Sequence, residues 1–375
     1  MTRAPLRVAH VVATAGRSGV ESYLTALLPA FDPGEVQARL FVPGPGPLVE
    51  TLARRGVRAE FGAPARKLAW ADARALADRL RGQCDVLHAH GPRAAFWAAG
   101  VARTAGIPRF VCTVHELRWR TLPPGLKREC WVALEAWALR RADALIVLSH
   151  DSEARVRARY PEWGDRLRLV PSSTPLLHDA GLLSPARPGA NEGPLRVVTI
   201  GRLQWVKRHD RVLDAVARCV QLGLDVELAI GGDGELDGAL RGHARSLGIA
   251  ERVHWLGGTF DVPALLASGH VFVTASISET FGIAALEAMA IGLPVVTCDN
   301  GGVTELVIDG ACGTVVRATS DPGAAQGIAD AIAALAADPA RRAAWGMAAA
   351  RRARESFSPT VMARATTAVY RDAPR

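Results

Sequence analysis

Two α/β domains, each built on a doubly wound parallel sheet, are predicted by three features of the sequence. Short runs of nearly continuous apolar residues alternate with amphipathic stretches of helical length, a pattern typical of parallel strands covered on both faces. The alternation restarts after residues 184–194, which are rich in proline and glycine. The length of 375 residues also exceeds that of one ordinary domain. We therefore expect Rossmann-like domains over 1–185 and 195–356.

The apolar runs define the expected strands, and the amphipathic stretches define the helices. In the first domain the strands are 6–12, 36–42, 85–90, 109–115, 143–149 and 166–171, with helices at 21–30, 67–82, 93–105 and 126–142. In the second domain the strands are 195–201, 226–232, 252–257, 271–276, 294–299 and 313–317, with helices at 209–221, 236–247, 281–291 and 322–337. The tail 340–375 reads as helix with a break at Ser358-Pro359, and its last part, about 357–375, is expected to pack back on the first domain. Ligands of open parallel sheets bind beyond the carboxyl ends of the strands, so we expect an active site between the domains.

Composition excludes several classes of protein. No apolar stretch reaches the roughly 20 residues of a membrane-spanning helix, and the first apolar run is broken by His10 and is too short for a signal peptide. The six cysteines are scattered without a CxxC pair, which argues against a zinc knot or a disulfide framework. We therefore expect a cytoplasmic protein.

Charge is distributed unevenly along the chain. Residues 1–190 hold 27 Lys and Arg against 17 Asp and Glu, whereas the remainder holds 18 against 20. The basic first half indicates an acidic partner, and an anionic membrane or a phosphate-bearing acceptor would serve as well as nucleic acid. No nucleic-acid-binding motif is recognised, so we expect no nucleic acid partner. A solvated basic surface is the alternative.

Two cations follow the first strand of the second domain. That strand ends at Gly201, and the turn after it carries Arg202 and Lys207 ahead of a helix. Arginine offers a planar fork and lysine a compact charge, and both suit a diphosphate. We expect the two to stabilise the negative charge that develops on a leaving nucleotide.

Two glutamates occupy the segment SISETFGIAALEAMAIGLPVV, residues 276–296. Glu279 precedes a helix that opens near Phe281-Gly282, and Glu287 lies inside that helix. At about 1.5 Å per residue, the two carboxylates are roughly 12 Å apart along the axis. That spacing does not suit the paired acid and base of a hydrolase, but it lets one reach a sugar and the other a ribose. The helix N-terminus between them would face phosphate.

The arrangement G-R-L-x3-K, then E-x7-E, with FGIAALEAMAIGLPVV and DNGGVTELV, resembles family 4 of the retaining GT-B glycosyltransferases (glycosyl transferases group 1). GGDGEL at 231–236 and GTF at 258–260 extend the resemblance. It implies that Arg202 and Lys207 bind the donor diphosphate and that Glu279 contacts the donor sugar. It also implies that Glu287 holds the ribose, with the backbone amides of Phe281, Gly282 and Ile283 around sugar and phosphate.

The first half resembles the same family more loosely. GRSGVESYL at 16–24 is similar to its glycine-rich loop, in which Gly19 would let the backbone approach phosphate or acceptor. DVLHAH and TVHE resemble its histidine-containing strand ends and place His115 in the catalytic cleft, with a weaker case for His88 and His90. VPSSTP departs from the family, because Ser172-Ser173 stands where an Asn-Gly turn is usual.

The resemblance implies a retaining, metal-independent transferase without a cofactor, the nucleotide-sugar (a UDP- or GDP-sugar) being a co-substrate. Its acceptor would be a lipid-linked or growing glycan of a bacterial cell envelope or exopolysaccharide. The segment 117–131 mixes Trp119, Leu122, Leu126 and Trp131 with Arg118, Arg120, Lys127 and Arg128. It fits a peripheral contact with the inner face of an anionic membrane, or an ordinary loop beside the cleft.

Other readings remain open at this point. A sugar-nucleotide 2-epimerase of GT-B fold, or a catalytically silent GT-B scaffold, would share much of the pattern. A dinucleotide-dependent oxidoreductase is disfavoured because no G-x-G-x-x-G follows a strand. A phosphorylase that uses pyridoxal phosphate is disfavoured because no cofactor lysine region is recognised.

Overall fold

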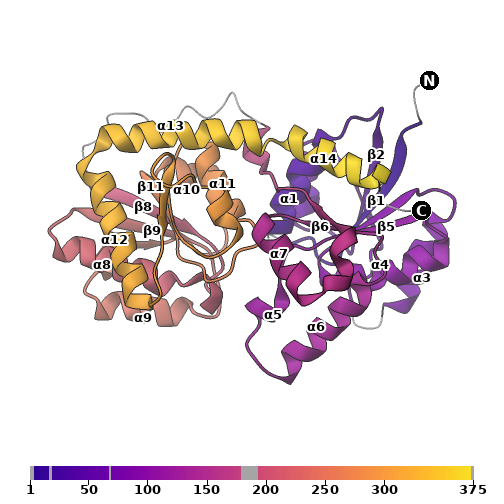
Figure 1. Ribbon diagram of the computed structural model, residues 1–375, viewed down its shortest axis with the longest axis horizontal. Coiled ribbons are helices and arrows are strands. Elements are labelled where there is room, and N and C mark those ends of the chain that lie inside the picture. The colour runs from indigo at the N-terminus through magenta and orange to yellow at the C-terminus, as the bar shows by residue number, and fades with distance from the viewer. Residues whose placement is uncertain (1–3, 17–18, 67–68, 179–192, 373–375) are drawn as a thin grey trace. The chain divides into compact units, whose positions relative to one another are not determined.

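The computed structural model describes residues 4–16, 19–66, 69–178 and 193–372, which form two compact units. Unit 1 comprises Met1–Pro175 with Phe357–Arg375, and unit 2 comprises Leu176–Ser356. Each unit holds one sheet of parallel strands with helices packed on it (Figure 1). The predicted fold class of two doubly wound α/β domains is confirmed. The expected linker, 184–194, lies almost entirely outside the described residues.

The sheet of unit 1 is entirely parallel, with the order β3-β2-β1-β4-β5-β6-β7. Its strands are β1 (Leu6–Val12), β2 (Val36–Val42), β3 (Ala59–Phe61), β4 (Val86–His90), β5 (Arg109–Thr113), β6 (Ala144–Val147) and β7 (Leu167–Leu169). The sequence predicted all of these except β3, which has three residues and too short an apolar run to be recognised.

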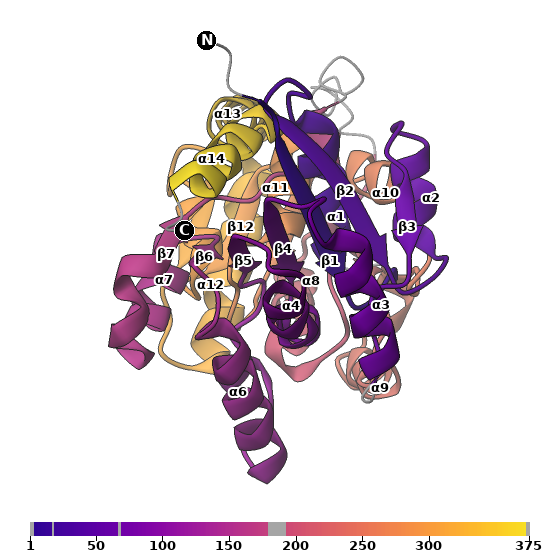
Figure 2. The ribbon, with the colours of Figure 1, turned by 90° about the vertical axis from the view of Figure 1, so that its right-hand side faces the viewer.

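Helices cover both faces of this sheet. They are α1 (Gly19–Leu27), α2 (Pro47–Ala53), α3 (Trp70–Leu80), α4 (Pro92–Ala105), α5 (Arg118–Thr121), α6 (Leu126–Leu139), α7 (His150–Arg159) and α14 (Pro359–Asp372). Helices α3, α4 and α6 pack together on one face, where Ala9 and Val11 of β1 join an apolar core (Figure 2). Helix α14 packs beside α1. Side chains alternate along a strand, so His10 of β1 points the other way and meets Tyr370 of α14.

The sheet of unit 2 is also parallel, with the order β10-β9-β8-β11-β12-β13. Its strands are β8 (Leu195–Ile200), β9 (Val226–Gly231), β10 (Val253–Trp255), β11 (Val271–Thr274), β12 (Val295–Cys298) and β13 (Gly313–Val316). Its helices are α8 (His209–Gln221), α9 (Asp237–Ser246), α10 (Val262–Ala267), α11 (Ile283–Ala290), α12 (Asp321–Ala337) and α13 (Pro339–Ser356). Helix α8 packs beside α12, and α11 packs beside α13.

Local sequence explains where several helices begin and end. The hydroxyls of Ser149 and Ser320 accept hydrogen bonds from backbone amides in the first turns of α7 and α12. Helix α4 ends at Gly106, which takes the left-handed conformation that closes helices. The predicted break at Ser358-Pro359 separates α13 from α14. Helices α2, α5, α7 and α10 were not predicted, because α2, α5 and α10 are short and α7 is highly polar.

All six cysteines are free thiols, and only Cys130 is exposed. Within the described residues, no helix combines the length and apolarity that crossing a membrane requires.

Candidate functional site

The strand order of unit 2 reverses between β8 and β11. Strand β8 leads to β9 and β10 on one side of the sheet, and β11 leads to β12 and β13 on the other. Loops that follow the two central strands diverge at such a point and leave room for a ligand. The donor residues predicted in this unit all lie in these two loops or in helix α11: Arg202, Lys207, Glu279, Phe281, Gly282, Ile283 and Glu287.

Lys207 and Glu279 come from the two different loops and form an ion pair. Lys207 Nζ lies 2.5 Å from Glu279 Oε2, and the two side chains are 27% and 19% exposed. The sequence singled out both residues but not their pairing, because 72 positions separate them. A partly exposed pair contributes on the order of 1 kcal/mol or less. An arriving diphosphate can therefore take the lysine from the glutamate at small cost.

Arginines at this edge have two different roles. The exposed Arg202 side chain makes no hydrogen bond or ion pair within the described part of the chain, so its guanidinium is available to a ligand. Arg208 is held instead by Asp210 at 2.7 Å and Asp321 at 2.5 Å. It is the one residue other than glycine with positive φ in the described ranges, at 51°. Arg208 therefore has a structural role, and the sequence alone did not distinguish it from the ligand-facing Arg202.

Backbone hydrogen bonds fix the loop that carries Glu279. Its amide lies 3.2 Å from the Asn300 carbonyl, and its own carbonyl accepts from Gly302 at 2.9 Å. Two residues earlier, the Ile277 amide donates to the Val206 carbonyl at 2.9 Å. The loops after β8, β11 and β12 are thus joined, which holds the Glu279 carboxylate beside Lys207.

Glycines of the GGDGEL segment let the loop after β9 pack directly on the loop after β8. A Cβ atom at Gly232 would lie 2.0 Å from the Gly201 carbonyl oxygen. At Gly234 it would lie 2.4 Å from the Leu203 carbonyl oxygen. Neither approach leaves room for a side chain, so these glycines shape the turn that presents Arg202.

The N-terminus of α11 is open to an anion. Its N-cap is Gly282, with φ of 100°, and no side chain caps the helix or places a carboxylate in its first turn. The first backbone N–H groups of a helix lack partners within the helix and attract negative charge. The helix begins at Ile283, two residues later than predicted, and the preceding Phe281 side chain is buried, so only its backbone can serve a ligand.

Glu287 lies in the second turn of α11 and is 8% exposed. It already interacts with another residue of the chain, so its burial does not by itself require a ligand. The ribose role therefore depends on the family resemblance alone.

The corresponding reversal in unit 1 lies between β1 and β4. Gly19 opens α1 after β1, while residues 17–18 of the predicted glycine-rich loop fall outside the description. His115 follows β5 and is partly buried. Tyr23 of α1 packs edge-on against its ring, with centroids 4.7 Å apart. The helix after the glycine-rich loop thus holds the predicted catalytic histidine.

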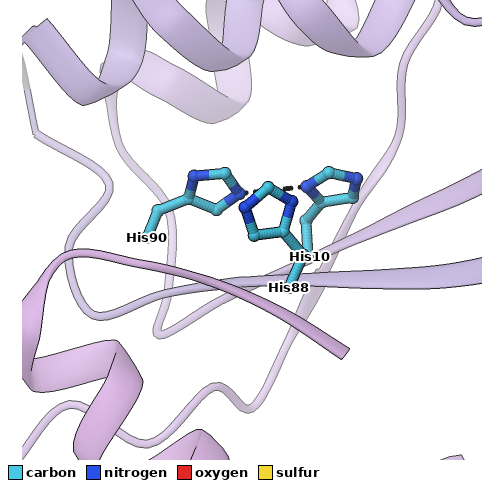
Figure 3. A group of neighbouring side chains, drawn as sticks. All are labelled: His10, His88 and His90. Atoms are coloured by element: carbon cyan, nitrogen blue, oxygen red, sulfur yellow. Dashed lines mark hydrogen bonds between the residues drawn. The ribbon is translucent and has the colours of Figure 1, made fainter. Parts of the chain in front are cut away.

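Three further histidines gather behind His115. His10, His88 and His90 are buried, and Figure 3 shows their rings close together. His10 and His88 are direct neighbours across β1 and β4. The case for His88 and His90 from the sequence was weak, and His10 was considered only as an interruption of an apolar run. The signal that could have joined them is that His10 and the H-x-H of β4 stand at matching positions of adjacent strands.

Burial keeps these imidazoles uncharged. Desolvation lowers the pKa of His10 and of His115 to about 3, and it lowers the pKa of His88 and His90 well below the ordinary value. One ring nitrogen from each of His10, His88 and His90 lies within 4.8 Å of the other two. These distances alone would admit a metal ion, but the same nitrogens also make hydrogen bonds.

Ser172 and Ser173 are fully buried. The Ser173 hydroxyl donates to the Phe357 carbonyl at 2.6 Å, just before α14. The Ser172 hydroxyl donates to the Ser173 carbonyl at 3.3 Å. Both serines therefore bond to backbone, and the bond of Ser173 fixes the start of the last helical segment in unit 1.

The segment 117–131 differs from the exposed mixture that the sequence suggested. Trp119 packs against the core and Tyr160, and Arg118 stacks on Trp131 with 5.2 Å to the ring centroid. Of the four apolar residues named for it, only Leu126 lies mostly in solvent, at 82% exposure. Further exposed apolar residues lie along α6, namely Leu134 and Trp137.

Comparison with known proteins agrees with this geometry. The model of "Glycosyltransferase Family 4" matches residues 17–174, and that of "Glycosyl transferases group 1" matches 183–352. HepE of Anabaena, solved with UDP and glucose, superposes with a TM-score of 0.82 at 20% identity, covering 98% of this chain and 100% of HepE. The fold is therefore that of the GT-B glycosyltransferases.

Sequence relatives carry the assignment further. Alpha-maltose-1-phosphate synthase of Mycolicibacterium smegmatis is 30% identical over 76% of this chain and 78% of its own length. A GDP-mannose-dependent alpha-(1-6)-phosphatidylinositol monomannoside mannosyltransferase of the same species is 32% identical over 66% of each chain. The chain belongs to the group 1, family 4 glycosyltransferases. Its activity is glycosyl transfer.

Proposed function

We propose that unit 2 binds a nucleotide-sugar and that the enzyme transfers the sugar with retention of anomeric configuration. One observation carries the proposal: the Lys207–Glu279 pair stands where the strand order reverses, beside the uncapped N-terminus of α11. A cation, a carboxylate and the first backbone amides of a helix then lie close together at one edge of the sheet. They match the leaving diphosphate and the hydroxyls of a donor.

Each residue has a defined task in this proposal. Lys207 leaves Glu279 and, together with Arg202, stabilises the diphosphate as charge builds on it. Glu279, released from the lysine, accepts hydrogen bonds from hydroxyls of the transferred sugar. Glu287 holds the ribose, and the amides near Gly282 contact phosphate. Two cations and a helix N-terminus take the place of a metal ion, so transfer is metal-independent.

The reaction then needs no protein nucleophile. The bond between the anomeric carbon and the diphosphate oxygen breaks, and the leaving group departs as nucleoside diphosphate. The acceptor oxygen bonds to the same face of that carbon and gives its proton to a donor phosphate oxygen. Positioning and stabilisation of the leaving group supply the catalysis, and His115 contacts the transferred sugar.

Unit 1 binds the acceptor, for which we propose a lipid-linked or growing glycan of the cell envelope at the cytoplasmic membrane surface. The relative named as a phosphatidylinositol monomannoside mannosyltransferase acts on a lipid. Helix α6 extends away from the sheet of unit 1 (Figure 2). It exposes Leu126, Leu134 and Trp137, while Arg141 lies 3.8 Å from the Trp137 ring centroid. Apolar residues with neighbouring arginines suit an anionic bilayer.

Donor binding is tested by thermal shift and calorimetry with UDP-, GDP- and ADP-sugars. One of them should raise the melting temperature of the wild type through preferential binding to the folded state. Arg202→Ala should weaken that binding about tenfold or more, whereas Arg245→Ala, an exposed arginine on α9, should leave it unchanged. Absence of binding by every nucleotide-sugar would instead favour a catalytically silent GT-B module, and turnover without an acceptor would favour an epimerase.

Membrane contact is tested by flotation with vesicles that contain anionic lipid. The triple variant Leu126→Ser, Leu134→Ser and Trp137→Ser should lose most of the bound fraction. The matched control changes two exposed apolar residues of unit 2, Leu222→Ser and Ile308→Ser, which are 65% and 48% exposed. Equal flotation of the wild type and the triple variant would remove the membrane from the proposal.

A further inference from the structure

His115 belongs to a continuous chain of hydrogen-bonded side chains inside unit 1. Its Nε2 lies 3.3 Å from Nδ1 of His90. Nε2 of His90 lies 3.0 Å from Nδ1 of His10, the contact drawn in Figure 3. Both of the ring nitrogens of His90 are thus engaged by other imidazoles.

The chain continues through the last helix of the unit. Nε2 of His10 lies 3.4 Å from the hydroxyl of Tyr370, on α14. That hydroxyl is 2.7 Å from Nδ1 of His88, whose Nε2 is 2.7 Å from the Thr113 hydroxyl. Tyr370 is therefore the link between the histidine of β1 and the first histidine of β4.

Burial makes the chain directional. His10, His88, Tyr370 and Thr113 have no measurable exposure, and His90 is 3% exposed. A neutral imidazole has one donor and one acceptor nitrogen, and a hydroxyl has one proton to donate. Because each buried group must donate to one neighbour and accept from the other, all of the protons point toward His115 or all point away from it. Reversing one bond would leave buried polar atoms without partners.

This coupling determines the tautomer of His115. When the protons point toward it, its Nε2 accepts and its Nδ1 carries the proton. When they point away, Nε2 donates and Nδ1 carries a lone pair. A residue at the far end of the chain thus decides which chemical face the histidine offers.

We propose that Tyr370, together with His10 and His88, positions His115 by holding its imidazole in one tautomer through this chain. The proposal rests on the proposed function, in which His115 contacts the transferred sugar. It gives α14 a part in catalysis: the helix supplies the hydroxyl that joins the two halves of the chain.

A metal ion on His10, His88 and His90 is the competing use of the same nitrogens. Both ring nitrogens of His88 already lie at 2.7 Å from hydroxyls, and the facing nitrogens of His10 and His90 lie at 3.0 Å from one another. An ion would have to displace at least two of these bonds. The hydrogen-bonded chain satisfies every one of them, so the geometry favours it.

The experiment is nitrogen-15 NMR of the histidine side chains of the full chain, with steady-state kinetics. Each of the four histidines in the wild type should show one protonated and one unprotonated ring nitrogen. Tyr370→Phe removes one oxygen from the middle of the chain. It should average the two nitrogen signals of His115 and reduce kcat about 10- to 100-fold, with the KM for the donor unchanged. Tyr160→Phe, whose hydroxyl bonds only an exposed arginine in unit 1, is the matched control and should behave as wild type.

Thr113→Val, which removes the hydroxyl at the far end, should act in the same direction and serves if Tyr370→Phe does not fold. Wild-type signals and kcat in a folded Tyr370→Phe would overturn the proposal, as would averaged signals in the wild type or one equivalent of bound zinc in the purified protein. The proposed function fails separately, if His115→Gln keeps wild-type turnover. The NMR result does not depend on turnover, so the two failures are distinguishable.

Discussion

The two sheets of this glycosyltransferase carry polar groups at equivalent points in opposite states. In unit 2, where the strand order reverses at β8 and β11, the groups are charged, partly exposed and paired across loops, as Lys207 and Glu279 show. In unit 1, where it reverses at β1 and β4, they are uncharged imidazoles under a helix, with His10 and His88 fully buried. Partial exposure keeps the desolvation cost of a charge small, so a ligand can displace the partner of that charge. Complete burial removes the charge but fixes direction, because every donor needs an acceptor.

Substitution of the charged donor residues of unit 2 should have the largest effect, and the property affected should be catalytic activity. Lys207→Ala should lower turnover by about 100-fold or more, since a preorganised cation facing developing charge contributes about 3 kcal/mol. Glu287→Ala should also lower turnover by about 100-fold or more, because the donor ribose loses the carboxylate that positions it. Glu251→Ala, an exposed glutamate of the same unit, is the control. Turnover near the wild-type value in either variant would show that the donor residues are wrongly assigned.

The second largest effect is expected on folding stability in acid, and it comes from the buried, uncharged histidines of unit 1. The pKa of His10 and of His115 is about 3 in the folded protein, against about 6.5 when unfolded. Below pH 6.5 the unfolded chain binds protons that the folded chain refuses, so stability is complete above pH 6.5 and is lost as the pH falls toward 3. The loss is roughly 1.4 kcal/mol per pH unit for each such histidine. Urea unfolding at pH 7.5, 6 and 5 measures it.

A variant identifies the source of that pH dependence. His10→Asn should reduce the slope between pH 6 and 5 by about 1.4 kcal/mol per pH unit, the contribution of one buried histidine. His150→Asn, on the exposed surface of unit 1, should keep the wild-type slope. Stability that stays constant from pH 7.5 to 5 in the wild type would contradict neutral, buried imidazoles.

The third effect is expected from a change of backbone geometry at Gly282, the N-cap of α11. In Gly282→Ala the new Cβ would sit at φ of 100° and 2.9 Å from Val303 Cγ2. Unfolding free energy should fall by about 1–3 kcal/mol, and donor affinity should fall as the N-terminus of α11 shifts. Gly248→Ala, also at positive φ but with nothing within 4 Å, should cost about 1 kcal/mol and leave donor affinity unchanged. Equal effects in the two variants would deny the α11 N-terminus a special role.

The smallest effect should be that of the Lys207–Glu279 pair on stability. Glu279→Gln removes the pair but should change the unfolding free energy by less than about 1 kcal/mol, while it impairs transfer. A loss of several kcal/mol with little change in turnover would make the pair a structural feature. His10→Asn, in contrast, should lower both the unfolding free energy and the turnover.

The sequence was most informative where one strand or one helix contained the whole signal. Apolar runs such as 195–200 and the restart of the pattern predicted both sheets, and G-R-L-x3-K with E-x7-E placed the donor residues after two strands of the second domain. Pairings between distant segments were not visible in it. Nothing local indicates that Lys207 meets Glu279, that Arg208 is held by Asp321, or that Tyr370 reaches His88, 282 positions away. Each depends on which strands are neighbours, and periodicity does not specify strand order.

Helix α14 has a consequence for how the protein is made. Unit 1 begins the chain, but it closes with residues 359–372, which are synthesised after all of unit 2. Domains usually fold in the order of synthesis. In this chain the sheet of unit 1 stays incomplete until α14 has been synthesised, because Tyr370 is needed to cover His10 and His88. Unit 2 can be completed before that. The unit that is translated first is therefore the last to reach its native state, and a ribosome that stalls before residue 359 leaves it unfinished.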